Sequence, residues 1–147
     1  MTFPHDIDEF AARFAACTLP KEEWTHQAHL AIGLWHVHRH GPDDALSRLR
    51  DGIRRLNDVH GTINSETGGY HETITRAYVL LLAQFNELQP PNVPVQARVN
   101  DLLGTKFVER TFLFDFYSRD LLKSSQARKA WVAPDLGPLR LNEKPMS

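Results

Sequence analysis

The 147-residue chain has one cysteine, no long apolar run and almost no net charge. A lone cysteine, Cys17, excludes an internal disulfide, and its apolar neighbours are typical of a helix face in a reducing compartment. The longest apolar run, residues 78–83, is too short to cross a bilayer, and the first residues lack the pattern of a secretory signal. A net charge of -1 gives no general attraction to nucleic acid or to an anionic membrane. We therefore expect a cytoplasmic protein that binds neither.

Several motifs that identify enzymes are also missing from the sequence. The chain has no glycine-rich phosphate loop, CxxC pair, HExxH, GxSxG or His-Asp doublet of the HD-phosphohydrolase kind. Its length is that of one domain, and 41% of its residues are hydrophobic, which is enough for a single core. We expect one helical domain, residues 1–147, whose functional site is not formed by any of these motifs.

Apolar residues recur at helical spacing along most of the chain, and proline and glycine mark the breaks. The pattern predicts helices over about 6–17, 20–40 (with Thr25 as an alternative N-cap), 43–60, 70–88, 95–103 and 124–131. Residues 107–117 fit both strand alternation and helical spacing, and we expect a helix because no partner strand is evident. The sequence thus predicts an all-α, single-domain helical bundle with an extended C-terminal tail, whose residues 131–141 are apolar enough to pack on the bundle.

Four of the eight histidines can be placed at one end of this bundle. His26 and His29 are three residues apart, about 60° around a helix axis, so both can reach one ion. His60 continues the apolar stripe of its helix, and His71 shares a helix face with the apolar residues that follow it. Short connections make neighbouring helices antiparallel, which brings all four histidines to the same end.

Four imidazoles that face one volume are typical of a transition-metal site. Neutral imidazole binds Zn, Fe, Ni or Cu, and three protein ligands leave a position open for water or substrate. The sequence therefore predicts a divalent transition-metal site formed by at least three of these histidines, with access through the gap at Gly33. A hydrogen-bonded polar cluster in the core is the alternative.

The helix that carries His26 has further histidines along the same stripe. His36 and His40 continue the spacing, but about 21 Å separates His26 from His40 along a helix. Both therefore lie too far along the helix to join the cluster, and we expect them to be solvated near the helix C-terminus.

Other side chains near the histidines are candidates for chemistry. Glu72 is a candidate catalytic base on metal-bound water, or an orienter of a ligand, although a solvated first-turn carboxylate would have the same position. Thr75 and Tyr78 share the inward side of His71 and are candidates for substrate binding, unless they only satisfy the histidines. Arg119 is a candidate for binding an acidic substrate, and a helix-capping ion pair is its alternative role.

Several blocks of the sequence resemble an uncharacterised family of small all-helical bacterial proteins. These blocks are 23–30 (EWTHQAHL), 60–61 (HG), 67–75 (TGGYHETIT), 117–119 (YSR) and 131–136 (WVAPDL). The resemblance covers most of the chain and implies that the blocks form one unit, but it implies no activity. A broader similarity, of architecture alone, is to helical bundles of the DinB type, which can hold a metal through histidines of different helices.

The sequence leaves three functions open. The first is a metal-binding bundle that acts on a small molecule, with hydrolysis by metal-activated water as the simplest chemistry and a redox role for iron or copper as a variant. The second is a non-catalytic bundle that binds a ligand or partner, with a pH-sensitive histidine cluster. The third is a metal-free enzyme with His26 or His71 as general base. Each is compatible with a homodimer.

Overall fold

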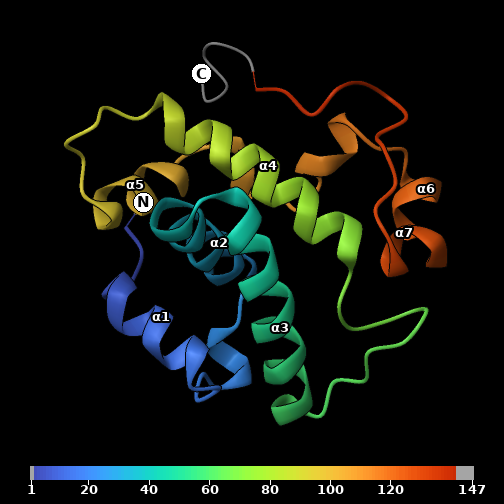
Figure 1. Ribbon diagram of the computed structural model, residues 1–147, viewed down its shortest axis with the longest axis horizontal. Coiled ribbons are helices and arrows are strands. Elements are labelled where there is room, and N and C mark those ends of the chain that lie inside the picture. The colour runs from blue at the N-terminus through green and yellow to red at the C-terminus, as the bar shows by residue number, and fades with distance from the viewer. Residues whose placement is uncertain (1, 142–147) are drawn as a thin grey trace.

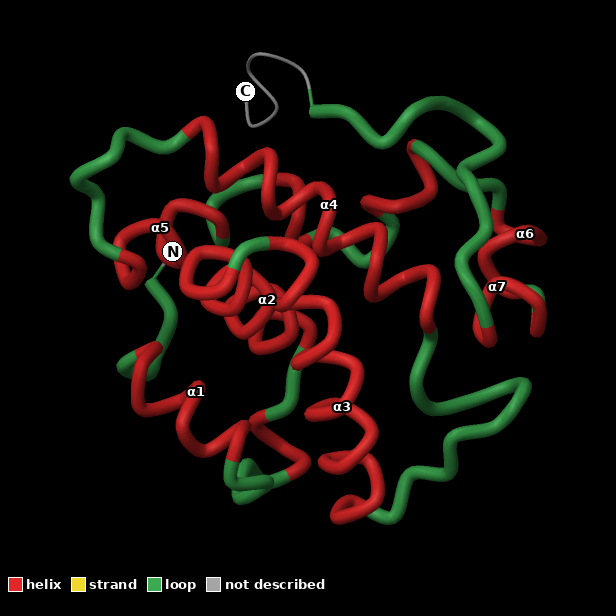
Figure 2. Tube along the Cα trace, in the orientation of Figure 1, coloured by secondary structure: helices red, strands yellow, loops and turns green. Residues whose placement is uncertain are grey.

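The computed structural model describes residues 2–141, and these residues fold into a bundle in which one helix is surrounded by four others (Figure 1). The central helix is α2, His26–His40, and its neighbours are α1 (Ile7–Ala15), α3 (Pro42–His60), α4 (Glu72–Leu88) and α5 (Val95–Leu102). Figure 2 shows helices and loops throughout, with no strand in this part of the chain. The all-α bundle predicted from the sequence is confirmed. None of the helices described here combines the length and apolar character of a membrane span.

The helix boundaries follow from local capping. Asp6 accepts a hydrogen bond from the backbone N–H of Glu9 at the start of α1, and Thr25 accepts one from Ala28 at the start of α2. The alternative start at Thr25 is therefore the correct one, and residues before it form only a 3-10 turn, η1 (Lys21–Glu23). Gly41, with φ of 80°, joins α2 directly to α3.

Because α2 is covered on nearly all sides, it buries residues all round its axis. His36 is one of them: it is only 6% exposed, its Nδ1 donates to the carbonyl oxygen of Ile32 at 2.8 Å, and its ring meets the edge of Phe14. The expectation that His36 is solvated near the helix C-terminus is wrong, because α1 and α3 cover this part of α2. His40 stays partly exposed, with Nδ1 3.5 Å from the carboxylate of Asp44.

The helix predicted over residues 107–117 is absent. Two 3-10 turns, η2 (Lys106–Val108) and η3 (Phe112–Asp115), take its place and carry Phe107 and Phe112 into the core. These two rings pack with centroids 4.5 Å apart and lie against Tyr78 of α4. Packing of aromatic rings, rather than helical periodicity, thus determines the local conformation.

Two short helices follow the 3-10 turns, and Figure 1 shows them beside the first turns of α4. Helix α7 (Ser125–Lys129) begins after the N-cap Ser124 at the predicted place, whereas α6 (Arg119–Lys123) was not predicted. Its N-cap Ser118 accepts a hydrogen bond from the backbone N–H of Leu121.

The segment 131–141 packs on the bundle, as predicted. Thr73 of α4 donates to the carbonyl oxygen of Ala130 and accepts from the N–H of Val132. Gln84 holds the far end of the segment through its side-chain amide, and Leu136 projects outward at 59% exposed. The apolar side chains that contact the core are Trp131, Val132, Leu139 and Leu141.

The proline-rich connection between α4 and α5 is fixed by one side chain. Arg98, only 4% exposed, donates hydrogen bonds from its three guanidinium nitrogens. The acceptors are carbonyl oxygens of Asn86, Pro90, Pro91 and Val93 and the side-chain oxygen of Asn86. This side chain therefore satisfies backbone groups that form no regular structure.

Candidate functional site

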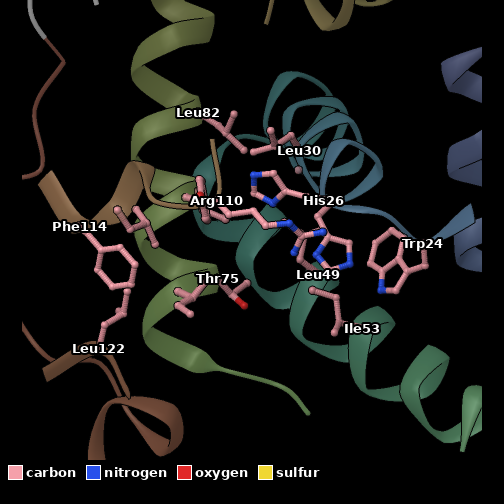
Figure 3. Close-up of a pocket in the computed structure, with 16 residues that line it drawn as sticks. Trp24, His26, Leu30, Leu49, Ile53, Thr75, Leu82, Arg110, Phe114 and Leu122 are labelled. Carbon is pink, nitrogen blue, oxygen red and sulfur yellow. The ribbon is translucent and has the colours of Figure 1, made fainter. Parts of the chain in front are cut away.

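A cavity of about 250 Å³, partly open to solvent, lies between α2, α3, α4 and residues 110–122 (Figure 3). Most of its wall is apolar and comes from leucine, isoleucine, valine and aromatic side chains. The polar members of the wall are His26, His29, Thr75, Tyr78 and Arg110. A mainly apolar cavity with a few polar groups is the usual form of a small-molecule site.

His29 is one of three polar side chains of this wall, with Tyr78 and Arg110, that form no hydrogen bond with residues 2–141. Its imidazole packs against Trp24, with ring centroids 4.0 Å apart, and residues 2–141 provide no hydrogen bond to either ring nitrogen. His29 is exposed to solvent and lines the cavity, which is itself partly open, and other protein atoms crowd its ring. Burial, helped by the charges of His26 and Arg110, lowers the pKa of His29 to about 4. At neutral pH its uncharged ring can accept a proton, bind a metal or form hydrogen bonds with a ligand.

His26 lies one turn before His29 and is held in place by η2. Its Nε2 lies 3.2 Å from the carbonyl oxygen of Phe107. A carbonyl can only accept, so Nε2 carries the proton and Nδ1 carries the lone pair. Burial lowers the pKa of His26, and the bond to Phe107 opposes this shift. The two histidines thus share one cavity wall in their neutral forms.

Gly33 forms the gap that the sequence predicted next to these histidines. A methyl group placed on Gly33 would come within 2.8 Å of the Leu82 side chain, and both residues line the cavity. The absence of a side chain on Gly33 therefore keeps this part of the cavity open.

His60 lies outside the cavity wall. Its Nε2 donates to the carbonyl oxygen of Leu19 at 2.7 Å, close to the end of α1. The reason is helix length: His60 is nineteen residues after Gly41, whereas His26 is fifteen before it. Helix α3 therefore runs about one turn beyond the start of α2, and its last histidine meets the preceding loop.

His71 also lies outside the cavity wall, because it precedes α4 instead of belonging to it. Its backbone is extended, its Nδ1 accepts the N–H of Ile74, and its Nε2 donates to the carbonyl oxygen of Leu122 at 2.7 Å. Both ring nitrogens are thus used, and no lone pair is left for a metal.

The expected convergence of at least three histidine side chains is therefore wrong. Within residues 2–141, no three His, Cys, Asp or Glu side chains are grouped so that they could hold a metal ion. The structure brings together only His26 and His29 at the cavity.

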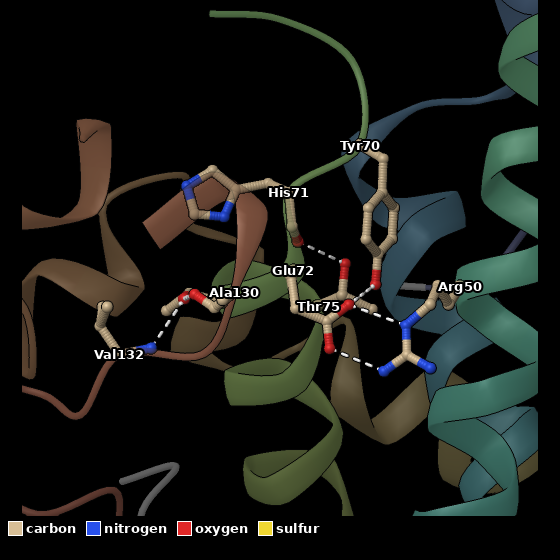
Figure 4. A network of polar contacts seen from close by, with 8 residues as sticks. Arg50, Tyr70, His71, Glu72, Thr75, Ala130 and Val132 are labelled. Carbon is tan, nitrogen blue, oxygen red and sulfur yellow. Dashed lines mark hydrogen bonds and ion pairs between the residues drawn. The ribbon is translucent and has the colours of Figure 1, made fainter. Parts of the chain in front are cut away.

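Glu72 belongs to a separate polar network (Figure 4). Both of its carboxylate oxygens accept from Arg50, at 2.8 and 2.7 Å, and Tyr70 donates its hydroxyl to the same carboxylate. The hydrogen bond from Arg50 is the main cause that lowers the pKa of Glu72. The imidazole of His71 points to the other side of the chain in Figure 4. The geometry gives Glu72 a structural ion pair and offers no support for a role as general base at the cavity.

Thr75 and Tyr78 line the cavity, and Arg119 does not. Thr75 donates its hydroxyl to the carbonyl oxygen of His71, and burial raises the pKa of Tyr78 to about 12, so the phenol stays protonated. Residues 2–141 provide no hydrogen bond to the Tyr78 hydroxyl. The guanidinium of Arg119 instead lies 4.3 Å from the ring centre of Phe114, which forms part of the wall.

Arg110 is the polar wall residue that the sequence analysis did not predict. It follows η2, and Figure 3 shows its side chain extended into the cavity toward His26. No sequence signal distinguishes it from the other arginines, because its position depends on the 3-10 turns that replaced the predicted helix.

No protein-family model, curated protein or solved structure matches the chain. The interpretation of the site therefore depends on the geometry of the cavity and on the chemistry of its five polar residues.

Proposed function

We propose that the protein binds a small, mainly apolar molecule in the cavity between α2, α3 and α4. The observation that carries this proposal is the mainly apolar cavity itself, whose wall includes His29 without any hydrogen bond from its ring to residues 2–141. His29 is solvent-exposed, so its ring is accessible and has no partner within residues 2–141. A bound molecule would supply that partner.

The rest of the wall supports the same proposal. The Tyr78 hydroxyl is a second polar group that residues 2–141 leave unpaired, and the apolar residues around it can take up a hydrocarbon or aromatic body. The polar groups fix orientation and the apolar wall provides most of the binding free energy.

Two neutral probes, octan-1-ol and 4-phenylbutan-1-ol, test the proposal. We expect NMR signals of His29 and Tyr78 to shift on titration, because each probe carries one hydroxyl and an apolar body. Gly33→Leu would fill the gap beside Leu82 and should abolish the shifts. Gly137→Leu is the control, because a Cβ atom there would have no neighbouring atom within 4 Å and the position lies outside the cavity wall. Absence of any shift with either alcohol up to its solubility limit would contradict the proposal.

A metal-dependent function is a second candidate, and the pair His26–His29 favours it. Two neutral imidazoles one helical turn apart could provide two ligands to Zn, Fe, Ni or Cu, with water or a bound molecule completing the coordination. Such a site would have the open positions that hydrolysis by metal-activated water requires.

Elemental analysis of protein purified without a His tag separates the two candidates. A metal site predicts stoichiometric metal that His29→Ala removes and that the exposed control His38→Ala retains. If the wild type takes up no metal after supplementation, the first candidate alone remains.

Three further expectations concern the location, the family and the oligomeric state of the protein. The reducing character indicated by the single cysteine supports a cytoplasmic location. The all-helical fold is compatible with the resemblance to small bacterial helical proteins and with a DinB-like architecture. Either a monomer or a homodimer could bind the proposed ligand.

A further inference from the structure

Arg110 gives the cavity one full positive charge without a negative counterpart. It is the one Lys or Arg among the wall residues, and the wall contains no Asp or Glu. Within residues 2–141, Arg110 forms neither a salt bridge nor a side-chain hydrogen bond. Arg50 is different in this respect, because Glu72 balances its charge and accepts two hydrogen bonds from it.

The position of Arg110 also separates it from an ordinary surface arginine. Arg110 is an exposed residue on the connection between η2 and η3, and its side chain also lines the partly open cavity (Figure 3). The unpaired His29 and Tyr78 line the same cavity. Leucines of α2, α3 and α4 supply the apolar part of the wall.

We infer that the ligand of this cavity is an apolar monocarboxylate whose carboxylate pairs with Arg110 and whose hydrocarbon or aromatic body packs against the leucines. This inference rests on the proposed function and specifies its ligand class. A planar guanidinium can donate two parallel hydrogen bonds to one carboxylate, which is the strongest pairing available to a single arginine. One cationic group balances one negative charge. The phenol of Tyr78 can donate a further hydrogen bond to a carboxylate oxygen.

The test compares each acid with the alcohol of the same skeleton. The pairs are octanoate with octan-1-ol and 4-phenylbutanoate with 4-phenylbutan-1-ol, titrated into the full chain by calorimetry at low ionic strength. At least one acid should bind about tenfold more tightly than its alcohol or better, because a charge-assisted hydrogen bond contributes about 1.5–3 kcal/mol.

Arg110→Met identifies the source of that preference. Methionine keeps an unbranched apolar side chain but removes the charge, so the acid should lose about tenfold in affinity or more while the alcohol is little affected. Arg55→Met is the matched control: it removes the same charge from the exposed side of α3, away from the wall. It should leave the affinities for both members of each pair unchanged. Thermal unfolding of both variants verifies that they fold.

The outcomes separate this inference from the function on which it rests. Equal or tighter binding of the alcohols in the wild type, or unchanged acid binding in Arg110→Met, would overturn the carboxylate and leave the cavity as a site for neutral molecules. Binding of none of the four probes would overturn both proposals. A loss of acid affinity that is as large in Arg55→Met as in Arg110→Met would show general electrostatic attraction and also overturn the pairing with Arg110.

Discussion

The imidazole of His71 donates from Nε2 to the carbonyl oxygen of Leu122 at 2.7 Å. Its other ring nitrogen accepts a free N–H of the first turn of α4, that of Ile74, so one side chain caps α4 and ties it to α6. The residue is only 7% exposed, and both of its hydrogen bonds are therefore shielded from water. This histidine stabilises the fold instead of coordinating an ion.

His71→Ala should accordingly destabilise the protein by about 1–3 kcal/mol, because it leaves a backbone N–H and a carbonyl without their partner. Urea unfolding monitored by circular dichroism measures this change. His38→Ala is the control, since His38 is exposed, and its effect should stay within about 0.5 kcal/mol. Equal stability of the two variants would show that the capping bonds contribute nothing.

Glu72→Gln should weaken the fold while the affinity for the proposed ligand stays unchanged. The substitution removes a carboxylate that receives two hydrogen bonds from Arg50 and one from Tyr70, and we expect a loss of about 1–3 kcal/mol. The control is Glu66→Gln, whose ion pair with Lys129 is solvent-exposed and should matter little.

The same carboxylate sets a pH dependence. The pKa of Glu72 is lowered in the folded state, mainly by the hydrogen bond from Arg50. Its ionised form therefore stabilises the fold fully above the ordinary pKa of a glutamate, and this stabilisation is lost as the pH falls through the lowered pKa. Urea midpoints measured across this acidic range should show a smaller pH dependence in Glu72→Gln than in the wild type.

His36 should make the protein sensitive to mild acid. Burial lowers its pKa from 6.5 to about 4, so the folded state favours the neutral ring. Stability is then complete above about pH 6.5 and falls as the pH decreases toward about 4, by a total of about 3 kcal/mol. Unfolding free energies of the wild type and His36→Phe as a function of pH measure this contribution. A parallel pH dependence of the two proteins would contradict the assignment.

Gly33→Ala should reduce ligand affinity with little change in stability. The new methyl group would push the flexible end of Leu82 into the cavity, while alanine favours the helix by about 1 kcal/mol over glycine. Calorimetry with 4-phenylbutan-1-ol and thermal unfolding measure the two effects. Gly52→Ala is the contrasting case, since its methyl would meet the buried Phe14 ring at 2.5 Å and should cost about 1–3 kcal/mol. Unchanged affinity in Gly33→Ala would argue against the cavity as the binding site.

Gly69→Ala should destabilise the connection between α3 and α4. Gly69 has φ of 80°, and a Cβ there would come within 2.6 Å of the Ile63 carbonyl oxygen and the Asn64 side chain. We expect a loss of more than about 1 kcal/mol. Gly68→Ala provides the matched control, because its nearest neighbour would be 3.9 Å away. Hydrogen exchange of residues 61–71 would show the difference locally.

The sequence predicted those parts of the site that lie inside regular helices. His26, His29 and Gly33 follow the spacing of α2, and Thr75 and Tyr78 follow that of α4, so all five were placed on the correct inward face and all line the cavity. Helical periodicity determines the direction of a side chain wherever the helix continues.

The predicted histidine cluster was wrong for two reasons. One helix was extended beyond its true end, and neighbouring helices were assumed to end at the same level. Helix α4 begins at Glu72, so His71 has extended backbone angles and its direction no longer follows the helix. His60 does lie within α3, but the relative lengths of α2 and α3 decide what it meets. Arg110 reaches the cavity only because aromatic packing bends residues 106–115 into 3-10 turns, and such long-range packing leaves no periodic signal.

The hydrogen bonds of Arg98 join α5 to the proline-rich connection that precedes it. The chain between Leu88 and Val95 forms few hydrogen bonds of its own. Its carbonyl oxygens instead accept hydrogen bonds mainly from the guanidinium of Arg98, a residue of α5. If α5 unwinds, the guanidinium of Arg98 moves away and the connection loses these hydrogen bonds as well. We therefore expect the proline-rich connection to unfold together with α5 as one local unit.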